Sequence, residues 1–165
     1  SMEIERKFTV KNLPENLTSY PCHVIEQAYL NTDPVVRIRR QDNTYYLTYK
    51  GKGLLAREEY NLPLNETAYY HLRAKADGNV ISKKRYVIPI TQPAFAKPVE
   101  IPADGLLLNV ELDLFEEPFA PLIIAEVEFP SKEIAEAFVP LDWFSQDVTN
   151  DPAYHNSNLS QKNFH

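Results

Sequence analysis

Apolar and polar residues alternate with a period of two along most of the chain. In residues 3–10, Glu3, Glu5 and Lys7 alternate with Ile4 and Phe8. In a β-strand these two sets point to opposite faces. Similar runs, rich in β-branched and aromatic residues, predict eight strands, at 3–10, 23–31, 35–41, 44–50, 55–62, 79–88, 107–116 and 122–129. The pattern therefore predicts a mainly antiparallel sheet.

Two segments with helical signals interrupt the strands. Residues 65–77 begin with Asn65 as a cap and stop at Gly78, and residues 131–139 begin with Ser131 and stop at Pro140. An antiparallel sheet of eight strands has two exposed edges unless it closes. We therefore predict an α+β fold that is mainly antiparallel β: an eight-stranded closed β-barrel with helices packed outside. A length of 165 residues predicts a single domain over 1–165. Residues 140–165 are expected to pack on one end of the barrel.

The cysteine count, the net charge and the length of the apolar runs indicate which partners and which cellular compartment to expect. The single cysteine, Cys22, excludes an internal disulfide, so we expect a buried thiol and a cytoplasmic location. The net charge of −6 argues against a nucleic-acid partner. No apolar run approaches the roughly 20 residues of a membrane span, so no membrane partner is expected. The sequence leaves open whether two chains form a homodimer. We interpret the four dispersed histidines, at 23, 71, 155 and 165, as surface or packing residues.

Charges of the same sign recur at every second position of the predicted strands. Basic pairs and acidic pairs occupy separate strands, whereas a solvated strand face usually mixes charges with neutral polar residues. Like charges that are neighbours on one face cost energy unless countercharge reaches them. If the charged faces point into the barrel, a basic wall and an acidic wall compensate each other across the lumen.

The two walls together suit one kind of ligand. Arginine and lysine donate hydrogen bonds to phosphate oxygens, arginine often through two nitrogens at once. Carboxylates without histidine or cysteine neighbours suit Mg²⁺ or Mn²⁺, and Mg²⁺ is commonly held by one or two carboxylates together with substrate phosphates. The sequence therefore predicts a polyanion bound with its metal, such as a short linear phosphate chain.

The charged segments also resemble a known family. "EIERKF" is similar to the ExExK signature of the CYTH superfamily, the triphosphate tunnel metalloenzymes. Later segments resemble that family in the same order: "EQAYL", "VRIRR", "YLTYKGK", "REEYN", "ISKKRY", "VELDLF", "AEVEF" and "DVTNDPAYHNSNL". The resemblance implies an eight-stranded antiparallel tunnel, dependence on a divalent metal and action on triphosphates. Short chains with this pattern mostly resemble bacterial-type tripolyphosphatases.

The resemblance implies a role for each charged position. Lys83 is the candidate that orients or deprotonates the attacking water, and Tyr29 assists by hydrogen bonding. The Arg57 and Glu59 side chains are expected to form a structural pair inside the tunnel. The implied phosphate-binding residues are Lys7, Arg37, Arg39, Lys50, Lys52 and Arg85. The implied metal ligands are Glu3, Glu5, Glu111, Asp113, Glu126 and Glu128.

The favoured prediction is metal-dependent hydrolysis of inorganic tripolyphosphate by an inorganic triphosphatase. Two enzymatic alternatives stay open: a class IV-type adenylate cyclase and a thiamine triphosphatase. A third alternative is a noncatalytic polyphosphate-binding module. The acidic strands count against this module, because an anion receptor gains nothing from six carboxylates that face its ligand.

Overall fold

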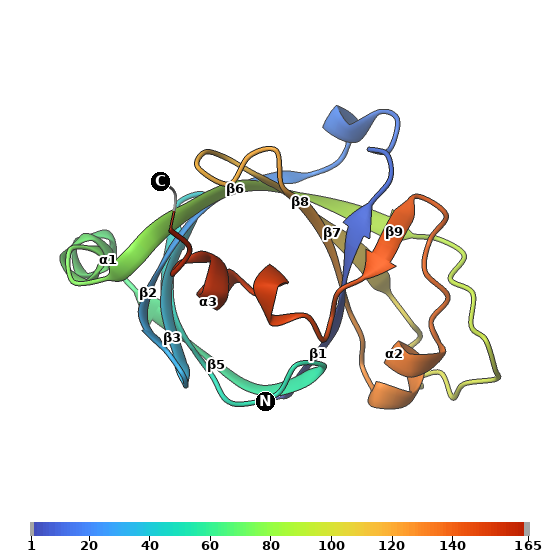
Figure 1. The fold of residues 1–165 in the computed structure, drawn as a ribbon. Coiled ribbons are helices and arrows are strands. Elements are labelled where there is room, and N and C mark those ends of the chain that lie inside the picture. The colour runs from blue at the N-terminus through green and yellow to red at the C-terminus, as the bar shows by residue number, and fades with distance from the viewer. Residues whose placement is uncertain (1, 164–165) are drawn as a thin grey trace.

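Eight antiparallel strands close into a barrel in the computed structural model, which describes residues 2–163 (Figure 1). The sheet order is β5-β4-β3-β2-β6-β7-β8-β1, and β1 pairs with β5 through Glu3 and Arg57 to close the ring. The predicted barrel is confirmed. The strands of the ring are β1 (Met2–Val10), β2 (Cys22–Thr32), β3 (Val35–Gln41), β4 (Thr44–Lys50), β5 (Ala56–Leu64), β6 (Asp77–Ile90), β7 (Leu108–Phe115) and β8 (Ile123–Glu128).

A ninth strand and several helix boundaries differ from the prediction. Strand β9 (Phe144–Asp147) pairs with β1 outside the ring. Helix α1 (Glu66–Arg73) ends before Gly78, which lies in β6 with a φ of 75°. Helix α2 (Lys132–Ala137) is shorter than predicted. The remaining elements are η1 (Leu17–Ser19), η2 (Pro152–Tyr154) and α3 (Asn156–Leu159).

The main hydrophobic core lies outside the barrel wall. Apolar positions of β1, β7 and β8, among them Phe8, Leu112 and Val127, pack beneath α2 and β9. The rings of Phe8 and Phe144 stack with their centroids 4.6 Å apart. A smaller cluster around Ile38 packs under α1. Because each strand alternates, burial of its apolar face on the outside leaves its charged face for the interior.

Apolar side chains also fill one end of the barrel interior. We call this cluster the apolar floor. It consists of Tyr29, Val35, Ile81, Phe115, Phe119, Ile124 and Leu159. Leu159 comes from the C-terminal strap, our name for residues 148–162, which crosses the barrel opening in the view along its axis (Figure 1). The strap therefore packs on one end of the barrel.

Cys22 is exposed at the start of β2, so the prediction of a buried thiol was wrong. Helix α1 covers β3 and β4. His165 lies outside the described residues. Within residues 2–163, no helix has the length and apolar character needed to cross a membrane.

Candidate active site

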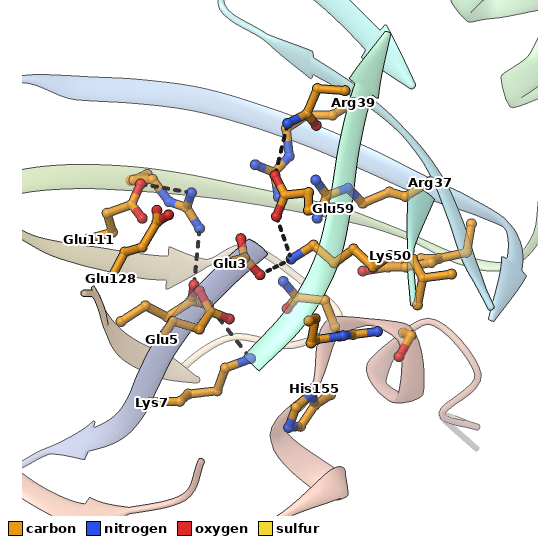
Figure 2. A pocket seen from close by; sticks show the side chains of 18 of the residues that line it. Glu3, Glu5, Lys7, Arg37, Arg39, Lys50, Glu59, Glu111, Glu128 and His155 are labelled. Carbon is orange, nitrogen blue, oxygen red and sulfur yellow. Dashed lines mark hydrogen bonds and ion pairs between the residues drawn. The ribbon is translucent and has the colours of Figure 1, made fainter. Parts of the chain in front are cut away.

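A charged cavity of about 390 Å³ occupies the barrel interior above the apolar floor. Most of the residues predicted to bind phosphate or metal line this cavity, and Figure 2 shows their side chains pointing into it from both sides. The predicted site residues in its wall are Glu3, Glu5, Lys7, Tyr29, Arg37, Arg39, Lys50, Arg57, Glu59, Arg85, Glu111, Glu126 and Glu128. The strand pattern thus brings together charges from the whole length of the barrel sequence.

Arg37 and Arg39 of β3 form the basic side of the cavity. Gln27 Oε1 accepts hydrogen bonds from Arg39 Nε (2.9 Å) and Nη2 (2.6 Å), and Thr48 Oγ1 accepts one from Arg37 Nη2 (3.1 Å). These partners are neutral, so they orient the guanidinium groups without cancelling their charge. Within residues 2–163, the buried Nε of Arg37 has no hydrogen-bond partner. Such a donor at a cavity wall favours an anionic ligand.

Lys50 links the basic side to the acidic strand β1. Its Nζ donates a 2.8 Å hydrogen bond to Glu3 and lies 3.6 Å from the Glu59 carboxylate. Arg57 donates from Nε to the Gly51 carbonyl at 3.1 Å. Arg57 and Glu59 both line the cavity, but Arg57 bonds to Gly51 and Glu59 lies beside Lys50, so their direct pairing stays a prediction.

Arg85, Asp113 and Lys83 form a buried ionic cluster in the wall between β6 and β7. Arg85 holds both Asp113 oxygens through Nε (2.7 Å) and Nη2 (2.8 Å). Lys83 Nζ lies 2.7 Å from the second Asp113 oxygen, without the alignment of a hydrogen bond. Lys83 is 1% exposed and Asp113 is 0% exposed, and neither lines the cavity. Asp113 is engaged by Arg85 and Lys83, so its position does not support the predicted metal contact, which stays a prediction.

The burial of Lys83 also shifts the pKa of its amine. Burial lowers the pKa of the amine to about 7; Asp113 opposes this shift, while the Arg85 and Arg39 cations add to it. The neutral amine needed by a base is therefore accessible near neutral pH. Because the amine lies beneath the cavity surface, action on a water in the cavity requires rearrangement of its ion pair with Asp113.

Two carboxyl groups of β1 are held partly protonated. Burial, then repulsion from Glu5, raises the pKa of Glu3 to about 8. Burial, then repulsion from Glu126, raises the pKa of Glu5 to about 7. Carboxyl groups that are crowded in this way favour an added cation, which would release their protons.

The pKa of Glu126 on β8 is lowered, in contrast to those of Glu3 and Glu5. Burial opposes its ionisation, but the cations of Lys7 and Arg85, at 3.7 and 3.8 Å, hold its pKa well below the ordinary range. Glu111 is also engaged, because its carboxylate accepts a 3.1 Å hydrogen bond from Arg85. The acidic side thus contains carboxylates with cationic partners, such as Glu126 and Glu111, and carboxyl groups with raised pKa values, Glu3 and Glu5.

The donor set suits a hard divalent cation that shares its coordination with the substrate. Among the described residues, no three carboxylate, histidine or cysteine side chains gather closely enough to form a ready-made metal site. Mg²⁺ does not require such a site, because it keeps waters and commonly binds one or two carboxylates plus phosphate oxygens. Glu3 and Glu5 fit that role best, because they share one strand face and have raised pKa values.

Besides the buried Lys83 and Asp113, the structure leaves Lys52 outside the cavity, and it adds several other residues to the site. Lys52 is exposed in the loop between β4 and β5 and does not line the cavity, so its predicted phosphate contact is not supported by its position. The period-two pattern ends with β4, so Lys52 does not follow Lys50 inward. Residues that the prediction missed are Gln27, Gln41, Tyr46, Asn61, His155, Asn156 and Ser157.

His155 lies in the cavity wall, a position that the sequence did not predict for it. It is buried in the cavity wall, with Nε2 3.1 Å from the Thr149 carbonyl oxygen. Burial, then the Lys7 cation, lowers its pKa. No strand periodicity marks the strap, so its approach to the cavity had no signal in the charge pattern.

The fold and the two-sided charge of its interior define a closed barrel with a charged cavity, and sequence comparison gives the family. The CYTH domain model matches residues 1–147, and the chain belongs to the CYTH domain family.

Two relatives cover almost the whole chain. An inorganic triphosphatase of Nitrosomonas europaea is 36% identical over 162 residues, which are 96% of each chain. An inorganic triphosphatase of Acetivibrio thermocellus is 32% identical over 169 residues, with 98% of this chain and 97% of the relative covered.

Solved structures agree with the barrel. The crystal structure of the inorganic triphosphatase NE1496 superposes with a TM-score of 0.64 at 32% identity and covers 97% of this chain and 95% of its own. The PH1012 protein of Pyrococcus horikoshii, at 18% identity and a TM-score of 0.54 over 82% of each chain, supports the fold alone.

Proposed function

We propose that this protein is an inorganic triphosphatase that hydrolyses tripolyphosphate with Mg²⁺ or Mn²⁺. The observation that carries the proposal is the convergence of Arg37 and Arg39 on one side of the cavity with Glu3 and Glu5 on the other. A bare anion receptor would have the first set without the second. The relatives described above, each an inorganic triphosphatase, support the same reaction.

The cavity residues divide the chemistry between them. Arg37, Arg39 and Lys50 bind and orient the phosphate oxygens, because their charged donors point into the cavity. Glu3 and Glu5 would hold the divalent metal, with Glu126 and Glu128 nearby on the neighbouring strand β8 and Glu111 on β7. When bound, the metal would neutralise charge on the phosphate oxygens.

In the reaction, water attacks a terminal phosphorus of tripolyphosphate, the bond from that phosphorus to the bridging oxygen breaks, and phosphate and pyrophosphate are released. Lys83 is the proposed group that orients or deprotonates this water, and Tyr29 is proposed to assist from the cavity wall. Arg85 binds phosphate in the proposal, although its contacts with Asp113 and Glu111 also give it a structural role. We also propose a cytoplasmic location.

Phosphate release tests this proposal directly. Tripolyphosphate, ATP and thiamine triphosphate are compared side by side with Mg²⁺, with Mn²⁺ and with a chelator. We expect fast release from tripolyphosphate with metal and none with chelator. Cyclic nucleotide formed from ATP would instead identify an adenylate cyclase, and preferred hydrolysis of thiamine triphosphate would identify a thiamine triphosphatase. Tight binding of all three without turnover would identify a binding module.

Metal binding is expected to weaken as the pH falls. The pKa values of Glu3 and Glu5, about 8 and about 7, mean that each carboxyl gains a proton as the pH falls through its value. The metal must displace these protons, so its affinity should fall about tenfold per pH unit for each proton displaced. Titration calorimetry with Mg²⁺ between pH 6 and pH 8.5, in buffers with different heats of ionisation, measures the affinity and the proton release. An affinity that does not change over this range would contradict the assignment.

A further inference from the structure

The apolar floor ends the polar cavity abruptly. Five strands each contribute one inward-facing apolar residue to it, and these five side chains are almost completely buried. The next inward residue on each of these strands is polar or charged. The five pairs, floor residue first, are Tyr29 and Gln27, Val35 and Arg37, Ile81 and Lys83, Phe115 and Asp113, and Ile124 and Glu126.

The C-terminal strap covers the same end and is fixed on both sides of the barrel. At β1, the Val148 amide donates to the Lys7 carbonyl at 2.8 Å, and Thr149 Oγ1 accepts from the Lys7 amide at 2.9 Å. At β6, the Asn79 amide donates to the Ser160 carbonyl at 2.6 Å.

The strap contacts β6 so closely that Gly78 is required there. A Cβ at this position would lie 2.2 Å from the Ser160 oxygen, and the φ of 75° also favours glycine. The strap is therefore a fixed wall of the cavity, and it contributes His155, Asn156 and Ser157 to the lining.

The opposite end of the barrel is open. A second hollow of about 840 Å³ adjoins the cavity there and shares Glu111 and Glu128 with it. Its other walls come from Val87 and Asn109 and from the loop before β7, where Leu107 is 81% exposed. A ligand can therefore extend out of the cavity at this end but not through the floor.

From this geometry we infer that the cavity is a blind tunnel that accepts only phosphate chains with a free terminal phosphate. That phosphate reaches the floor, and the other end of the chain lies at the open mouth, where it can carry an organic group. A chain that is esterified at both ends would have to place an organic group at the floor. No space remains for it there, because the core is closely packed and the strap is held by backbone hydrogen bonds. This inference rests on the proposed triphosphatase function.

Asn156 and Ser157 are the strap residues that meet the terminal phosphate in this arrangement. Both line the cavity, and both side chains contain hydrogen-bond donors. Asn156 Oδ1 is buried and, within residues 2–163, has no hydrogen-bond partner. That oxygen is an acceptor and does not bond to a phosphate oxygen, so in this arrangement the Asn156 Nδ2 amide and the Ser157 hydroxyl donate to the terminal phosphate.

Competition with capped substrates tests the inference on the unmodified enzyme. ATP has one free phosphate end, and P1,P3-di(adenosine-5′) triphosphate has none. We expect ATP to compete with tripolyphosphate and the diadenosine compound to compete at least 100-fold more weakly, without being hydrolysed. Equal competition by the two compounds would overturn the inference, and so would failure of both, because the open mouth should admit one substituted end. Failure of the proposed function is seen separately, as absence of phosphate release from tripolyphosphate.

A pair of variants in α3 tests the floor contact. Asn156→Ala is expected to raise the KM for tripolyphosphate about tenfold through loss of a hydrogen bond to a charged group. Asn158→Ala is the matched control, because Asn158 lies in the same helix but is exposed and contacts the Pro152 carbonyl. An unchanged KM in Asn156→Ala would overturn the assignment of this residue to the terminal phosphate.

Discussion

Replacement of Glu5 by glutamine should reduce kcat/KM for tripolyphosphate by roughly 100-fold to 1,000-fold, the scale on which a catalytic metal stabilises developing charge. Glu5 lines the cavity beside Glu126, and burial, then repulsion from Glu126, raises its pKa to about 7. Glutamine keeps the shape of the side chain but removes the charge that would hold the metal. Steady-state phosphate release at several Mg²⁺ concentrations measures the effect, and calorimetry without substrate should show weaker Mg²⁺ binding.

The matched control for this variant is Glu136→Gln. Glu136 is exposed on α2, outside the barrel, so its loss should leave kcat/KM and metal binding unchanged. If Glu5→Gln kept its Mg²⁺ affinity and its activity within a factor of ten, Glu5 would not be a metal ligand.

Removal of the Lys83 amine should have an effect of similar size. We expect Lys83→Ala to lower kcat by at least about 100-fold, within the range found for general bases. The fold should persist, because Asp113 keeps two hydrogen bonds from Arg85. A melting curve checks that point, and phosphate release at saturating Mg²⁺ measures kcat.

The pH profile separates a base from a residue that only supports its neighbours. A base must be neutral to accept a proton, and the Lys83 pKa is about 7. Wild-type kcat should therefore rise with pH through about 7, and this rise should be lost in Lys83→Ala. Lys84→Ala is the control, since Lys84 is the next residue in β6 and is exposed on the outside. Activity of Lys83→Ala within tenfold of the wild type would remove Lys83 from the proposed mechanism.

Local alternation was sufficient to predict which side chains face inward. The positions of Glu3, Glu5 and Lys7 followed from one strand alone, because successive side chains of a strand always point to opposite faces. The same rule worked for Arg37 and Arg39, and all five line the cavity. The alternation of side chains did not place Lys52 correctly, because it applies only within an extended strand and Lys52 lies in the loop after β4.

Depth along the barrel axis could not be predicted in this way. Lys83 and Asp113 have the expected inward orientation, but the pairing of β6 with β7 sets them next to the apolar floor, beneath the cavity surface. Position along the axis depends on the register between strands, which alternation within one strand does not contain.

The sequence by itself determined the strands, the separation of basic from acidic faces and the resemblance to the CYTH superfamily, because these properties depend on local spacing and residue type. Only the tertiary structure decided that the barrel has one closed end, that Asp113 is committed to Arg85, and that His155 and Asn156 reach the cavity. These features require segments far apart in the chain to meet. Their contacts follow from the closure of the sheet and from the path of the strap. Neither can be predicted from a local sequence pattern.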